Sequence, residues 1–95
     1  MNPLRRLAIS LRHLRLSAGL TQEQMAEVAG FEFKFYQKIE NGRKPQVKLE
    51  TVERLGRPFG LEVWQILAPI EALRRMKTKR PRPKSPAKRG PRALP

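Results

Sequence analysis

Apolar residues recur every three or four positions along most of the chain, the spacing that places them on one face of an α-helix. The first such stretch runs from Asn2 to about Ser17. Its apolar stripe consists of Leu4, Leu7, Leu11, Leu14 and Ala18, and its arginines lie off that stripe. Asn2 is a favourable N-cap, and Pro3 fits the first helical position, where no amide donor is missed. Gly19 provides a stop. The pattern therefore predicts an amphipathic helix at the start of the chain.

Two shorter helices are predicted next. The first begins at Thr21, which forms a capping-box pattern with Gln24, and ends at Gly30 after about two turns. The second runs from about Phe33 to Glu40 and ends at an Asn-Gly pair. The second helix of such a pair is held away from the body of the domain, so that its outer face can enter a major groove. This requires a small residue where the helices cross, a glycine at the turn, and apolar anchors farther on. These positions are Ala26, Gly30, Phe35 or Tyr36, and Ile39.

Two further helices complete the predicted bundle. The fourth spans roughly Leu49 to Arg57, with Leu49, Val52 and Leu55 facing inward, and Pro58 ends or kinks it. The fifth spans about Glu62 to Leu67. We therefore expect an all-α domain of five helices over residues 1–68, followed by a short helical extension or linker over residues 69–76.

The chain changes character from Lys77 onward, where proline and basic residues dominate. Such a segment has almost no apolar surface to bury, so residues 77–95 are predicted to form a disordered tail. Residues 74–95 carry ten basic groups and no acid, whereas residues 1–73 carry eleven basic and eight acidic groups. This asymmetry indicates a polyanionic partner, either nucleic acid or an anionic membrane surface. Nucleic acid is favoured, because the tail has almost none of the aromatic and aliphatic residues that insert into a bilayer.

Side chains that carry out catalysis or bind metals are scarce. The chain has no cysteine and no aspartate, its glutamates are scattered, and His13 lies among arginines on the outer side of the first predicted helix. We therefore expect no enzyme activity, no metal and no cofactor. No apolar run approaches the roughly 20 residues of a membrane span, and the N-terminus lacks the pattern of a signal peptide. The expected location is the cytoplasm, in association with the nucleoid.

Several motifs between Leu4 and Leu67 follow one another in a set order. They are Leu14-Arg15, Gly19-Leu20-Thr21-Gln22, Met25-Ala26, Gly30, Ile39-Glu40-Asn41-Gly42, Pro45, Phe59-Gly60-Leu61 and Ile66-Leu67. With these motifs, about two thirds of the chain resembles the phage-repressor type of helix-turn-helix domain, the Cro/C1 or Xre family. The resemblance implies a five-helix, lambda-repressor-like fold. It also implies a transcriptional regulator, most often a repressor, that binds specific sites on double-stranded DNA.

The resemblance assigns roles to three groups of positions. Bases in the major groove would be contacted from the outward side of the third helix, by Glu32, Phe33, Lys34, Gln37 and Lys38. Backbone phosphates would be contacted by Gln22, Asn41, Arg43 and Lys44. A structural ion pair would join the first helix to the end of the third, between Arg15 and Glu40. Glu32 departs from the family pattern, which usually has a small hydroxyl residue there.

The chemistry of the outward positions supports this assignment independently. Lys34 and Lys38 are one turn apart and can face the groove together. Lysine can donate to the guanine acceptors, and glutamine can pair with adenine. Phe33 is compatible with contact to a thymine methyl group or with a packed edge of the domain. The tail would add nonspecific affinity by releasing counterions.

Other functions are compatible with the same fold. The chain can be an antitoxin, with a toxin as partner, or another protein-interaction module. Trp64 is compatible either with the core or with a homodimer surface in the region of the fifth helix. A dimer would bind half-sites about 10 base pairs apart. A basic packaging protein is a further alternative that depends on the tail alone.

Overall fold

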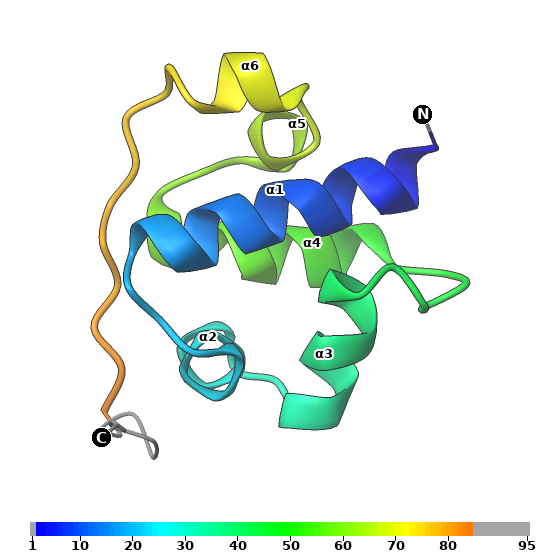
Figure 1. Ribbon diagram of the computed structural model, residues 1–95, viewed down its shortest axis with the longest axis vertical. Coiled ribbons are helices and arrows are strands. Elements are labelled where there is room, and N and C mark those ends of the chain that lie inside the picture. Colours follow the sequence, from blue (N-terminus) through cyan, green and yellow to red (C-terminus); the bar gives the residue numbers. More distant parts are fainter. Residues whose placement is uncertain (1, 85–95) are drawn as a thin grey trace.

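The computed structural model describes residues 2–84, and over that range the chain is helical and contains no strand (Figure 1). The α-helices are α1 (Pro3–Ser17), α2 (Gln22–Ala29), α3 (Phe33–Glu40), α4 (Leu49–Gly56), α5 (Val63–Ile66) and α6 (Ile70–Leu73). A 3-10 turn, η1 (Arg57–Phe59), follows α4 and contains the proline that was expected to end or kink that helix. The predicted all-α class and the order of the helices are confirmed.

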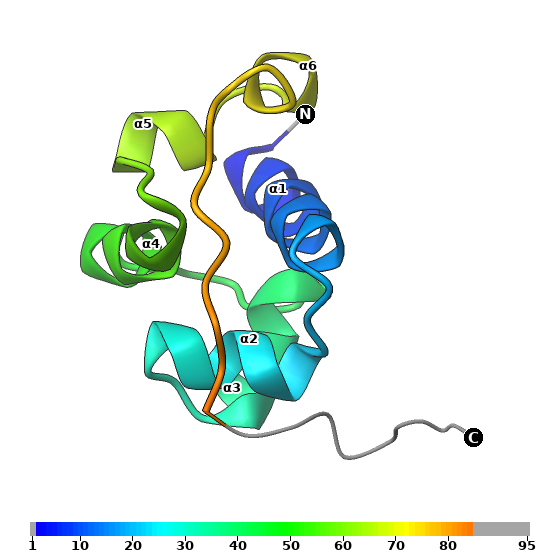
Figure 2. The same cartoon turned by 90° about the vertical axis from the view of Figure 1, so that its left-hand side faces the viewer.

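The helices surround one apolar core. α1 and α4 form two opposite walls, with α2 and α3 at one end and α5 and α6 at the other (Figures 1 and 2). Every one of these elements contributes at least one buried apolar side chain to the core. The largest of them are fully buried: Tyr36, Phe59, Leu7, Leu11, Met25, Ile39, Leu55, Ile66 and Leu73.

Local capping groups set the ends of the first two helices. The Asn2 side chain accepts a hydrogen bond from the Arg5 amide at 3.0 Å. Thr21 and Gln24 form both bonds of the predicted capping box, at 3.1 and 3.0 Å. Gly30 ends α2 with a φ of +80°, a left-handed conformation that glycine adopts without a steric penalty. The turn between α2 and α3 is therefore encoded in the sequence around it.

Two predicted core positions differ in the structure. Leu49 was expected to face inward, but its side chain is 69% exposed. It is the first residue of α4, where the helix emerges from the largely exposed segment 41–48, so the covered part of the helix begins later, at Val52. Phe35, one of the two candidate apolar anchors of the third helix, is only half-buried. Its ring packs against that of Phe31, with the centroids 5.2 Å apart.

Residues 77–84 form an extended segment that lies along the domain, which we call the strap. It runs from α6 past the gap between α1 and α4 to α2 (Figure 2). The Lys79 amide donates to the Phe59 carbonyl at 2.9 Å, and the Lys84 amide donates to the Glu27 carboxylate at 2.6 Å. The strap belongs to the tail that was predicted to be disordered from Lys77 onward. It has no helix or strand, and backbone hydrogen bonds join it to the domain. The rest of the predicted tail, residues 85–95, lies outside the described residues.

Candidate nucleic-acid interface

Helix α3 buries one side and exposes the other. Tyr36 and Ile39 anchor it in the core. The opposite side carries the residues that were predicted to contact bases. Glu32, Phe33, Lys34 and Lys38 are exposed, and Gln37 is half-buried. The structure therefore brings the predicted base-contacting residues together on one accessible surface.

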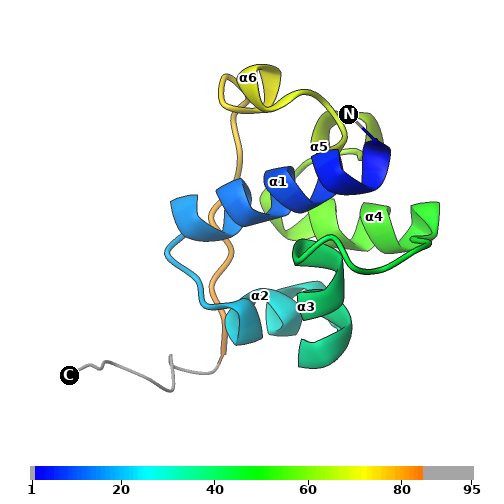
Figure 3. The ribbon, with the colours of Figure 1, turned by 45° about the vertical axis from the view of Figure 1, so that its right-hand side comes forward.

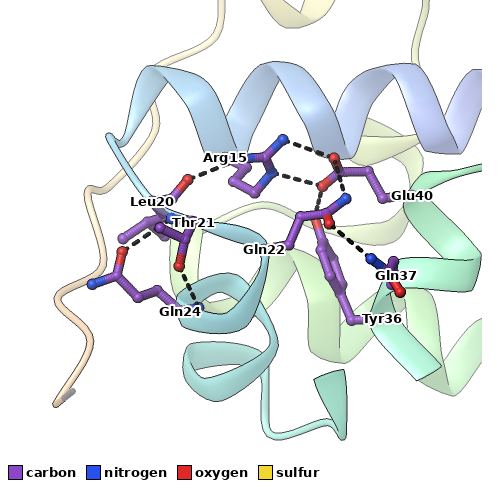
Figure 4. A network of polar contacts seen from close by, with 8 residues as sticks. All are labelled: Arg15, Leu20, Thr21, Gln22, Gln24, Tyr36, Gln37 and Glu40. Atoms are coloured by element: carbon purple, nitrogen blue, oxygen red, sulfur yellow. Dashed lines mark hydrogen bonds and ion pairs between the residues drawn. The ribbon is translucent and has the colours of Figure 1, made fainter. Parts of the chain in front are cut away.

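A chain of side-chain amides connects this surface to the interior (Figure 4). Gln37 donates from Nε2 to Oε1 of Gln22 at 3.3 Å, and Gln22 donates from Nε2 to Oε2 of Glu40 at 3.1 Å. Gln22 was predicted to contact a phosphate from the start of α2. Its amide keeps one N–H outside these two bonds, because a glutamine carries two amide hydrogens. The network orients Gln22 and leaves it a donor for a further acceptor.

The predicted ion pair between Arg15 and Glu40 is present. Two bonds of 2.9 Å join them, from Nε to Oε1 and from Nη2 to Oε2. Their side chains are only 13% and 3% exposed. Arg15 also donates from Nη1 to the carbonyl of Leu20 at 3.0 Å, and the Tyr36 hydroxyl donates to Oε1 of Glu40. Each oxygen of the buried carboxylate therefore accepts two hydrogen bonds within the domain: Oε1 from Arg15 and Tyr36, and Oε2 from Arg15 and Gln22.

This arrangement shifts the pKa of each group in the cluster. Burial favours the neutral form of Glu40, but hydrogen bonds from Arg15, Tyr36 and Gln22 outweigh it and hold the pKa of Glu40 below its usual value. Burial lowers the pKa of Arg15, yet its bonds to Glu40 and the opposite charge leave that pKa raised. Burial raises the pKa of Tyr36, and its bond to Glu40 raises it further. The pair is thus charged, and the phenol neutral, around neutral pH.

The predicted phosphate-contacting residues after α3 lie at its C-terminal end. Asn41 and Arg43 are exposed. Lys44 is half-buried, with its ammonium 5.3 Å from the centroid of the Phe35 ring. The same segment therefore presents two exposed polar side chains and one lysine that already contacts an aromatic face.

Two contacts that position α3 were not predicted from the sequence. The Tyr36 hydroxyl was treated only as part of a core residue, although its spacing of four from Glu40 places both on one helix face. Arg54 of α4 donates to the Gly30 carbonyl at 2.6 Å and lies 4.2 Å from the Phe31 ring centroid. It thereby ties α4 to the turn between α2 and α3. No local sequence signal identifies that contact, because it spans 24 positions.

Within residues 2–84, no group of three histidine or acidic side chains is arranged to hold a metal ion. None of the helices described is both long enough and apolar enough to cross a membrane.

Comparison with known proteins agrees with this geometry. Residues 6–63 match the family model of a helix-turn-helix domain. The structure is similar to the crystal structure of a hypothetical transcription factor from Neisseria, NHTF, with a TM-score of 0.69 and 26% sequence identity. That similarity covers 79% of this chain and 86% of the Neisseria chain. A search of the curated proteins found no match.

Proposed function

The chain belongs to the helix-turn-helix domain family, and from that premise we propose that it is a sequence-specific repressor that binds double-stranded DNA with α3 in the major groove. DNA binding and transcription regulation follow from the family and from the similarity to a transcription factor. Specific recognition by α3, and repression as its outcome, are the parts that we propose. A DNA-bound protein of this kind would be located in the cytoplasm with the nucleoid.

One observation carries the proposal: the outer face of α3 is fixed in space by contacts on its inner face. Tyr36 is buried in the core and bonded to Glu40, and Glu40 is paired with Arg15 of α1. A helix held this firmly can present Lys34 and Lys38 in a reproducible position, which base-specific contact requires.

The amide chain supports a specific role for Gln37. Its Nε2 donates to Gln22, and within residues 2–84 its Oε1 and second N–H form no further hydrogen bond. An amide restrained in this way is suited to the paired donor and acceptor of an adenine edge. Lys34 and Lys38 are suited to guanine, whose major-groove edge offers two acceptors.

Selection of preferred sites from random duplex DNA by the full-length protein tests the proposal. We expect a short preferred sequence to be enriched, and Lys34→Ala to weaken binding to it by about 1–3 kcal/mol while relaxing the preference at one position. Lys77→Ala is the matched control, because it removes the same charge from an exposed position beyond α6. Failure to enrich any sequence would refute specific recognition, and an equal loss in the control would refute the role of Lys34.

A specific observation also favours a protein partner on another face. Trp64 is 64% exposed and borders a hollow between α4 and α5. An exposed tryptophan is typical of protein interfaces. We propose that this face joins two copies of the chain, as a homodimer on two DNA half-sites. Sedimentation of the wild type and of Trp64→Ala, with and without DNA, checks this. A wild type that is monomeric in both conditions would contradict the proposal, and so would a dimer that Trp64→Ala leaves unchanged.

An antitoxin function is the alternative proposal for the same fold. It requires a toxin as the protein partner. A small toxin encoded next to this chain, and a stable complex between the two products, would favour it over a repressor that acts alone.

A further inference from the structure

A groove runs between α1 and the segment that follows α3. The turn after α3 lies directly against α1, because a Cβ added at Gly42 would be 4.0 Å from the Cβ of Ala8. Arg5 lies three residues before Ala8 and Arg12 four residues after it, so both project from the side of α1 that faces the turn. The lining of the groove includes Arg5 and Arg12 from α1, Glu40 from the end of α3, and Asn41, Arg43 and Lys44 from the turn.

The charge of this groove is strongly unbalanced. Arg5, Arg12, Arg43 and Lys44 line it, and Glu40 is its only acidic residue. The Glu40 carboxylate is almost fully buried and already paired with Arg15. Within residues 2–84, the guanidinium groups of Arg5, Arg12 and Arg43 form no ion pair or hydrogen bond. Three free guanidinium groups therefore border one concave surface with no free carboxylate in it.

The groove also continues the outer face of α3. Asn41 follows Gln37 by four positions and Lys38 by three, so it extends their side of the helix by one turn. Asn41 is also part of the groove lining. The side of the molecule that carries α3 therefore also carries the middle of α1 and the start of the segment leading to α4 (Figure 3). A duplex placed along α3 would bring its backbone toward the groove.

We propose that Arg5 and Arg12 of α1, together with Arg43, bind backbone phosphates of the DNA duplex. This inference rests on the proposed function and extends the contact surface to α1, to which the sequence assigned no DNA contact. Guanidinium groups suit this ligand, because their planar donors match two phosphate oxygens at once. Such contacts hold the duplex in register without distinguishing bases.

The test compares two double variants of the full-length protein that lose the same charge. Arg5→Ala with Arg12→Ala removes two arginines from the groove. Arg74→Ala with Arg75→Ala removes two exposed arginines beyond α6, at the end of the molecule opposite α3 (Figure 1). Affinity for the best selected duplex and for a shuffled duplex is measured by fluorescence anisotropy over a series of KCl concentrations. Thermal unfolding of each variant checks that the fold is retained.

We expect the groove variant to lose affinity for both duplexes by the same factor, about tenfold. We also expect the slope of log affinity against log salt to fall by between about one and two, since each phosphate contact contributes about 0.9. The control should change both quantities much less. Equal losses in the two variants, or an unchanged slope in the groove variant, would overturn the inference. Failure of the proposed function has a different signature, because the wild-type protein would then bind the selected and shuffled duplexes equally.

Discussion

Arg15 and Glu40 lie 25 positions apart in the sequence and form a two-point ion pair between α1 and the end of α3 (Figure 4). The same guanidinium donates to the Leu20 carbonyl just before α2. One arginine therefore connects three elements: α1, the segment that enters α2, and α3. Since Asn41 follows Glu40 directly, the pair also fixes the start of the segment after α3, which lines the groove. The orientation of the proposed recognition helix thus depends on a buried charge pair as well as on apolar packing.

Removing one member of this pair should be costly. We expect Glu40→Ala to lower the free energy of unfolding by about 3–5 kcal/mol, because it leaves the Arg15 charge poorly compensated and the Tyr36 hydroxyl without its acceptor. Urea denaturation measures this loss. Glu53→Ala is the control, because its pair with Arg57 is exposed, at 46% and 68%, and such pairs contribute about 0–1 kcal/mol. Similar losses in the two variants would contradict the structural role of Glu40.

The pair should also make stability depend on pH in the acidic range. The folded state holds the pKa of Glu40 below its ordinary value of 4.5. The stabilisation is therefore complete above about pH 4.5 and is lost as the pH falls through the folded pKa. We expect the difference in unfolding free energy between the wild type and Glu40→Gln to shrink as the pH is lowered from 7 toward about 3. A difference that does not change with pH would show that the charge of Glu40 contributes nothing.

The sequence predicts much of this fold because its helix ends depend on nearby residues. Asn2 caps α1, Thr21 and Gln24 cap α2, and Gly30 supplies the left-handed turn. Each interaction spans three or four positions, so a short stretch contains all of its partners. The ion pair between Arg15 and Glu40 spans 25 positions and was predicted only through the family resemblance.

Other features depend on how the elements meet in space. Arg54 reaches the Gly30 carbonyl from α4, and no local pattern distinguishes it from the other arginines of the chain. The hydrogen bonds of the strap are a second feature of this kind. A segment with almost no apolar residues cannot fold alone, but its backbone can still bond to acceptors on a folded domain, as Lys79 does with Phe59. Composition alone does not reveal that such a segment can bond to a folded domain.

Ser10 offers a test of the core beneath α1. It is fully buried, and its hydroxyl has no hydrogen-bond partner among the described residues. A desolvated hydroxyl without a partner is destabilising, and alanine also has the higher helix propensity. We therefore expect Ser10→Ala to raise the free energy of unfolding by about 1 kcal/mol, measured by urea denaturation. Ser17→Ala, at the exposed last position of α1, serves as the control. A loss of stability at Ser10 would mean that its hydroxyl is satisfied in the folded protein.

The strap and the residues beyond it should have separable effects. The strap, residues 77–84, carries five basic residues and is bonded to the domain through Lys79 and Lys84, whereas residues 85–95 carry three basic residues. We expect truncation after Lys84 to lower the salt dependence of DNA binding. Truncation after Met76 should lower the salt dependence further and also reduce the free energy of unfolding by about 1–2 kcal/mol, since it removes the hydrogen bonds of the strap.

Both truncated proteins should keep the site preference of the full chain, because α3 is intact in each. Equal stability of the two truncated proteins would show that the strap contributes nothing to the fold, and loss of site preference would show that specificity does not reside in α3.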